Sequence, residues 1–120
     1  MRDVALFPLG QWVQLGIADR RTDALLGDVG ICVAATKETA EIGFTLSVEA
    51  QGVGYGSEAV REAIDLIFDH SPVMQVLAVT DMRNTPSVRL LERVGMHRLD
   101  TVASMFRGNP CTEHIYGISR

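Results

Sequence analysis

The chain has 120 residues, of which 11 are Lys or Arg and 15 are Asp or Glu, so its formal net charge is −4 at pH 7. This length is typical of one compact domain, which we expect to span residues 1–120. An excess of negative charge is unsuited to a partner as acidic as nucleic acid, so we expect no such partner. The hydrophobic share of 47% indicates a globular protein with a substantial core.

Two cysteines, Cys32 and Cys111, are far apart in the sequence and lack C-x-x-C spacing. We therefore predict two buried free thiols, with neither a disulfide framework nor a metal site. The sequence contains no run of 18 apolar residues and no apolar leader behind a basic start, so we expect neither a membrane span nor export. These features favour a cytoplasmic location.

The first half of the chain is typical of three β-strands. Residues 12–18 and 25–35 are rich in β-branched, aromatic and small side chains, and the turn-like segment between them predicts a hairpin. In a third strand, residues 39–48, apolar side chains alternate with small or polar ones. One face of this strand should be apolar, and the other should carry Glu41, Gly43, Thr45 and Ser47.

The next segment predicts two helices separated by a strand. Residues 57–69 have apolar side chains at the i, i+3, i+4 and i+7 positions of an amphipathic helix that ends before a proline. Residues 74–80 predict a strand, and the continuous apolar run at residues 76–79 within it predicts that this strand is central with both sheet faces covered. A second helix begins at a cap formed by Asn84 or Thr85, and Gly95 supplies its left-handed C-terminal residue.

The tail predicts a closing hairpin. Residues 98–118 contain two β-like runs around a turn signal at residues 107–110. The resulting order is strand, strand, strand, helix, strand, helix, strand, strand. This order predicts an α+β, or mixed α/β, fold in which two helices flank one central sheet.

Three glycines, Gly52, Gly54 and Gly56, stand between the third strand and the first helix. Without a Cβ, they let backbone N–H groups approach an anion at the positive end of the helix dipole. A tight strand-to-helix turn needs glycine for steric reasons as well, and the glycines alone support the two interpretations about equally. Neither a Walker loop nor a dinucleotide-binding fingerprint fits the residues around them.

The pattern Gln51-x-x-Gly54-x-Gly56 resembles the Q/R-x-x-G-x-G/A pyrophosphate loop of the GNAT N-acetyltransferases. The sequence E-I-G-F at residues 41–44 and N-x-x-S-x-x-L-L-x-x-x-G-M at residues 84–96 are similar to the flanking motifs of the branch that modifies ribosomal-protein N-termini. The three segments occur in that family's order and spacing, and the resemblance runs from about Trp12 to the C-terminus. It implies a central, mostly antiparallel sheet.

The resemblance further implies that acetyl-CoA is the cosubstrate. The main chains of Leu46 and Val48 would pair with its pantetheine arm as though the arm were another strand. Asn84 and Ser87 would lie along the pantetheine and near the thiol, although a plain helix cap explains Asn84 equally well. The implied cofactor-binding residues are Leu46, Val48, Gln51, Gly52, Val53, Gly54, Tyr55, Gly56, Ser57, Asn84 and Ser87.

Backbone N–H groups from Gly52 to Ser57 would hold the pyrophosphate of acetyl-CoA. At the nucleotide end of the ligand, arginine side chains are further candidates for phosphate contacts. A solvated helix face is the more common role for such a set, which here comprises Arg83, Arg89 and Arg93.

The reaction of the family is direct transfer of an acetyl group to a primary amine, without a covalent enzyme intermediate. It requires a route for the ammonium proton and benefits from an acid for the departing sulfur. Glu41 is the candidate base because it shares the polar strand face with Thr45, although a solvated strand residue is the more common role of such a glutamate. Leu91 replaces the tyrosine that many members use as general acid, which leaves Ser87 as the candidate donor.

Members of this branch open with a strand and two helices before the position of Trp12, and those helices form one wall of the acceptor site. The chain is therefore expected to be shortened or split, or to form a dimer through exposed Leu6, Phe7, Leu9 and Trp12. The alternative to an enzyme is a CoA-binding or interaction module that transfers no acetyl group. The identity of the amine, a protein N-terminus or a small molecule, stays open.

Overall fold

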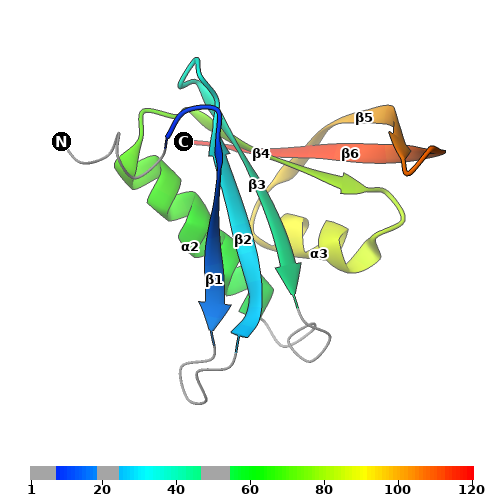
Figure 1. The fold of residues 1–120 in the computed structure, drawn as a ribbon, viewed down its shortest axis with the longest axis horizontal. Coiled ribbons are helices and arrows are strands. Elements are labelled where there is room, and N and C mark those ends of the chain that lie inside the picture. The colour runs from blue at the N-terminus through cyan, green and yellow to red at the C-terminus, as the bar shows by residue number, and fades with distance from the viewer. Residues whose placement is uncertain (1–7, 19–24, 47–54) are drawn as a thin grey trace.

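The computed structural model describes residues 8–18, 25–46 and 55–120, and the glycine segment up to Gly54 lies outside these ranges. Within them the chain forms a six-stranded sheet and two helices (Figure 1). The elements follow the predicted order, which confirms the α+β class. They are β1 Trp12–Ala18, β2 Leu25–Val33, β3 Thr39–Leu46, α2 Tyr55–His70, β4 Gln75–Asp81, α3 Thr85–Arg93, β5 His97–Phe106 and β6 Asn109–Ser119.

The strand order in the sheet is β1-β2-β3-β4-β6-β5, so β4 is central, as its apolar sequence predicted. Neighbouring strands are antiparallel in every pair except β3 and β4, which run parallel. A parallel pair needs a crossover connection, and α2 supplies it between these two strands. The sheet is therefore mostly antiparallel, as expected.

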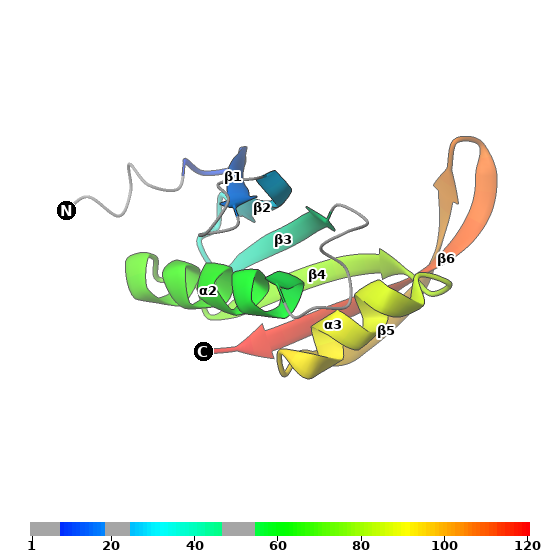
Figure 2. The ribbon, with the colours of Figure 1, turned by 90° about the horizontal axis from the view of Figure 1, so that it is seen from below.

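Both helices pack on one face of the sheet (Figure 2). Strand alternation directs Ile31 of β2 and Ile42 of β3, which lie opposite each other in register, into this core. α2 contributes Val60 and Ile67, and α3 contributes Leu91, all with at most 1% of their surface exposed. Burial of each such side chain stabilises the fold by about 1.5–3 kcal/mol. None of the helices in the described ranges is long and apolar enough to cross a membrane.

α2 begins at Tyr55, two residues earlier than the apolar spacing predicted. Gly56 and Ser57 lie in its first turn and are buried, so packing overrides the low helix propensity of glycine. At the other end, the hydroxyl of Ser71 donates to the carbonyl oxygen of Ile67 at 2.6 Å, immediately before Pro72. The proline stop was therefore predicted correctly.

α3 has the two end signals that the sequence predicted. The side chain of Asn84 accepts a hydrogen bond from the backbone N–H of Ser87 and caps the first turn. Gly95 follows the helix with φ of +95°. The N–H of Gly95 donates to the carbonyl of Glu92, and that of Met96 to the carbonyl of Leu91, which is the Schellman arrangement.

The sheet face opposite the helices is open in the described part of the chain, so the prediction that both faces of β4 are covered is wrong. Val79 on this face is 39% exposed, and Trp12 is 49% exposed. The apolar run of β4 led to a wrong prediction because both helices pack on the same face of the sheet. Cys32 also points to this face and Cys111 lies in the terminal hairpin, so both thiols are free but only partly buried, which corrects the expectation of full burial.

β5 and β6 form the predicted closing hairpin, which projects beyond the helices (Figure 2). Its turn consists of Arg107 and Gly108, with φ of 51° and 81°. Two successive left-handed residues match the twist of the flanking strands. The turn is tighter than the predicted residues 107–110, because Asn109 and Pro110 already pair within the hairpin.

Candidate active site

The parallel strands β3 and β4 separate at their C-terminal ends. They pair only through residues 39–42 of β3 and residues 75–78 of β4. Beyond this point, which we call the fork, β3 stays paired with β2 while β4 stays paired with β6, and the two strands diverge (Figure 1). In the described part of the chain, residues 43–46 therefore have one strand edge without a neighbour. An extended ligand with amide groups can bind such an edge as an added strand.

The start of α2 carries the described part of the predicted phosphate loop. Tyr55, Gly56 and Ser57 form its first turn, where backbone N–H groups lack acceptors within the helix and the helix dipole favours an anion. Leu46, the last residue of β3, lies on the free edge beyond the fork. The remaining predicted loop and pantetheine residues lie outside the described ranges: Val48, Gln51, Gly52, Val53 and Gly54.

Glu41 lies on β3 immediately before the fork, on the open face of the sheet. Its register partners are Cys32 on β2 and Leu77 on β4. The side chain is partly buried, and this burial, together with the negative charge of Glu113, raises the pKa of Glu41 above its usual range. A carboxylate with a raised pKa is a stronger base than an ordinary one, which suits Glu41 for accepting a proton.

Glu113 was not predicted from the sequence as a site residue. It lies on β6 opposite Asp81 of β4. Asp81 is neutralised by Arg83, whose guanidinium donates to it at 2.8 Å and holds the pKa of Asp81 at about 2. Glu41 and Glu113 form no ion pair with any residue that the structure describes. Only the pairing register of β6 brings Glu113 close enough to act on Glu41, and no local sequence pattern encodes that register.

α3 starts shortly after β4 ends (Figure 2). Asn84 caps this helix, and Ser87 lies in its first turn. The hydrogen bond from the N–H of Ser87 to Oδ1 of Asn84 measures 3.3 Å, so the cap interpretation of Asn84 is confirmed. Ser87 itself is partly buried in the first turn. Leu91, at the position where the family resemblance predicts a tyrosine, is fully buried in the core. That position therefore faces the sheet and supplies no acid.

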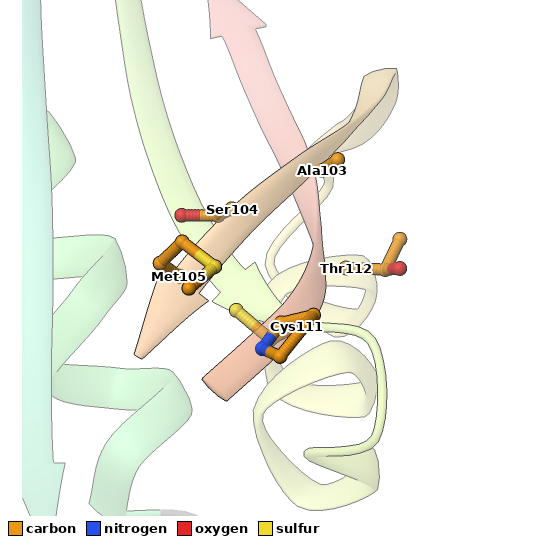
Figure 3. Close-up of a pocket in the computed structure, with 6 residues that line it drawn as sticks. Ala103, Ser104, Met105, Cys111 and Thr112 are labelled. Atoms are coloured by element: carbon orange, nitrogen blue, oxygen red, sulfur yellow. The ribbon is translucent and has the colours of Figure 1, made fainter. Parts of the chain in front are cut away.

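A surface cavity of about 430 Å³ lies on the terminal hairpin (Figure 3). Its lining comes from both strands: Ala103, Ser104, Met105, Pro110, Cys111 and Thr112. None of the predicted site residues contributes to it. Across the described ranges, no three His, Cys, Asp or Glu side chains gather as ligands of a metal ion would. The fork, rather than this cavity, collects the residues suited to chemistry.

The fold and site define an α+β domain in which a forked sheet adjoins the N-terminus of a crossover helix. Residues 5–97 match the acetyltransferase (GNAT) domain family. The chain belongs to this family.

Two bacterial relatives resemble the chain in sequence. The uncharacterised protein YkkB of Bacillus subtilis (strain 168) is 34% identical over 96 residues, which cover 78% of this chain and 56% of YkkB. The uncharacterised N-acetyltransferase p20 of Bacillus licheniformis is 31% identical over 90 residues, covering 74% of this chain and 51% of p20. The chain therefore spans about half the length of these curated relatives.

Solved structures agree with the fold. A GNAT-family acetyltransferase from Bacillus anthracis superimposes with a TM-score of 0.82 at 23% identity, covering 88% of this chain and 65% of that one. A Vibrio cholerae protein provisionally named a ribosomal-protein-serine acetyltransferase superimposes with a TM-score of 0.82 at 26% identity, covering 92% of this chain and 65% of that one. The acetyltransferase MccE, solved with acetyl-CoA and AMP, superimposes with a TM-score of 0.81 at 20% identity, covering 91% of this chain and 61% of that one.

Proposed function

We propose that this chain is an N-acetyltransferase domain that moves an acetyl group from acetyl-CoA directly to a primary amine. The observation that carries the proposal is the fork between β3 and β4, which leaves a free strand edge leading toward the start of α2. Membership of the GNAT family supports the same reaction. Acetyl-CoA combines an amide-rich arm with a pyrophosphate, and this edge and this helix end suit those two groups.

The pantetheine arm would extend along the free edge of β3 and hydrogen-bond to the main chain of Leu46 and, beyond it, Val48. The pyrophosphate would accept hydrogen bonds from backbone N–H groups between Gly52 and Ser57. The cap of α3 would contact the arm through the amide of Asn84, whose Oδ1 is engaged but whose NH₂ group has no partner among the described residues. Gln51 would complete the loop at its start.

In the proposed reaction, the amine nitrogen bonds to the thioester carbonyl carbon and the carbon–sulfur bond breaks. Glu41 would receive the proton that the ammonium loses, directly or through a water. Ser87 would donate a hydrogen bond to the departing sulfur. Glu41 lies on the open face immediately before the fork, and Ser87 lies in the first turn of the helix that packs on the other face.

The acceptor is proposed to be a protein N-terminus or a small-molecule amine. The Vibrio cholerae structure with the ribosomal-protein name favours the ribosomal-protein branch.

We also propose that the protein is a cytoplasmic single domain and that it associates as a homodimer. The homodimer is proposed because Leu9 and Trp12 are 39% and 49% exposed next to each other in the fold. Leu6 and Phe7, which were predicted to share this surface, lie outside the described residues.

Calorimetry with acetyl-CoA, followed by a thiol-release assay with a panel of amines and peptide N-termini, tests the proposal. We expect binding at micromolar to millimolar ligand and release of CoA thiol with at least one acceptor. A Gly54→Val variant should lose binding because the added side chain would meet the phosphates. Absence of binding would refute the proposed function. Binding without thiol release from any acceptor would instead favour a non-catalytic CoA-binding module.

A further inference from the structure

β5 is an edge strand of the sheet, so its outer side has no strand neighbour among the described residues. Of its 10 residues, Val102 and Ser104 are partly buried and all the others are exposed. Natural edge strands are usually protected by a charge, a proline or a very short length. Residues 101–106 of β5, T-V-A-S-M-F, include no charged residue and no proline. This segment is therefore suited to pairing with another strand.

The backbone groups on the outer side of β5 belong to every second residue. Thr101 is one of these residues, because its N–H donates to a side chain, Oδ1 of Asp100, at 2.7 Å. Its Oγ1 is also 2.9 Å from Nδ1 of His114 on β6, which is typical of the closer cross-strand pairs that share no backbone bonds. Ala103 and Met105 follow at two-residue spacing. Their N–H and C=O groups therefore point to the same free side.

The side chains along this edge complement each other when two copies are related by a twofold axis at Ala103. Antiparallel pairing around that residue places Asp100 of one copy opposite Phe106 of the other, on the same face of the sheet. Leu99 lies at the register shift of β5, and its side chain packs over Gly117 on that face. Leu99 and Phe106 are 51% and 62% exposed. In this arrangement, each copy covers the apolar side chain of the other.

Charge is complementary in the same arrangement. Arg107 is exposed, and its guanidinium carbon lies 5.1 Å from the centroid of the Phe106 ring. This position directs the guanidinium toward the carboxylate of Asp100, which faces Phe106 across the axis. Neither Arg107 nor Asp100 has an ion pair within the described part of the chain. The axis makes two such pairs at once, and they oppose the repulsion between two copies of net charge −4.

We propose that β5 pairs with β5 of a second copy, antiparallel and centred on Ala103, so that one sheet continues through both copies. This interface is additional to the homodimer contact proposed at Leu9 and Trp12, because β1 and β5 are the opposite edges of the sheet. It is self-complementary, as a twofold interface must be. It does not depend on acetyl transfer, since neither the fork nor the start of α2 includes a residue of β5.

Charge reversal in the full chain tests this interface. Asp100→Arg places arginines opposite each other, and Arg107→Asp places carboxylates opposite each other. Each variant should therefore have half the assembly mass of the wild type by light scattering at equal concentration. An equimolar mixture of the two variants restores both attractive pairs. Native mass spectrometry should find mixed assemblies there, with an apparent Kd at least about tenfold below that of either variant alone.

Two control variants carry the same changes of charge away from β5. Lys37→Asp is matched to Arg107→Asp, because Lys37 is also exposed and also has a left-handed backbone, with φ of 65°. Asp65→Arg, on the exposed side of α2, is matched to Asp100→Arg. Both controls should keep the wild-type mass. All four variants should bind acetyl-CoA as the wild type does, which also shows that they are folded.

Hydrogen exchange tests the interface in the wild type itself. The amides of Ala103 and Met105 should exchange faster when the protein is diluted, because they lose their strand partner. A wild type that stays monomeric at every concentration would overturn the proposal. Wild-type mass in both charge-reversal variants would also overturn it and leave assembly to the surface at Leu9 and Trp12. So would failure of those two variants to associate when mixed. Loss of acetyl-CoA binding in the wild type would instead refute the proposed function alone.

Discussion

The phenolic hydroxyl of Tyr116 on β6 donates a hydrogen bond of 3.2 Å to a carboxylate oxygen of Glu92 on α3. Tyr116 is 1% exposed, so this bond ties the terminal hairpin to the helix through the core. Burial, followed by the bond to Glu92, raises the pKa of Tyr116 above its usual value of 10. The folded state therefore favours the neutral, protonated form of the Tyr116 phenol.

Replacing Tyr116 with phenylalanine should lower the free energy of unfolding by about 1 kcal/mol at pH 7, the value of a typical hydrogen bond. The raised pKa adds a pH dependence with a defined sign. The contribution of the neutral Tyr116 phenol to the free energy of unfolding is fully present below pH 10. It is lost as the pH rises through the folded-state pKa, because the buried phenol must ionise. Urea unfolding at pH 7 and at pH 11 measures both effects. Wild type and Tyr116→Phe should converge at pH 11, and parallel pH dependences would contradict the assignment.

The Glu41→Gln variant should be more stable than the wild type at neutral pH. Because burial and Glu113 raise the pKa of Glu41, its ionisation destabilises the folded state. Relative to the variant, the wild type is therefore most stable below pH 4.5, the ordinary pKa of a glutamate. It loses stability as the pH rises through the folded-state pKa of Glu41. Thermal unfolding at pH 4 and pH 7 should show the gain at pH 7 alone. Glu38→Gln, in an exposed turn, should show none.

The same Glu41→Gln change should lower kcat by about 10²–10⁴-fold, the range for loss of a general base, and leave acetyl-CoA affinity unchanged. In the wild type, the pH at which the rate falls on the acidic limb of the pH–rate profile should be higher than the pKa of an ordinary glutamate. Glu113→Gln removes the repelling charge, so it should shift that limb toward lower pH and retain activity. An unmoved limb in Glu113→Gln would mean that Glu41 is not the group that titrates.

Asn84 allows its cap role to be separated from a ligand role. Asn84→Ala should destabilise the domain by about 1 kcal/mol, because the N–H of Ser87 loses its acceptor. Asn84→Asp keeps that acceptor and should retain stability, but it replaces the amide donor with a negative charge. Calorimetry should therefore show weaker acetyl-CoA binding for Asn84→Asp. Wild-type affinity in this variant would leave Asn84 with the cap role alone.

Gly95→Ala should lower stability by about 1 kcal/mol because alanine is strained at φ of +95°. Space is not the obstacle, since the nearest atom to an added Cβ, on Ile118, would be 3.7 Å away. Gly95→Asn should cost less, because asparagine tolerates the left-handed region. Chemical denaturation of the three proteins measures the order. Equal losses for both substitutions would indicate a steric cause instead.

Much of the fold could be predicted because its signals are local. The alternation in β3, the amphipathic spacing of α2 and the end signals at Asn84 and Gly95 depend on residues a few positions apart. The errors arose where packing decided the outcome. The covered second face predicted for β4 is absent in the described part of the chain, and α2 begins earlier than its apolar spacing indicated.

For the site, the sequence by itself determined the order of the strand, the glycine segment and the capped helix, and singled out Glu41, Asn84 and Ser87 by their type and spacing. Only the tertiary structure decided that β3 and β4 part at Ile42 and Ala78, that Glu113 raises the pKa of Glu41, and that Arg93 meets Ser57. The physical reason is sequence separation. Strand register and helix docking join residues dozens of positions apart through the packing of the whole core, and no local pattern specifies them.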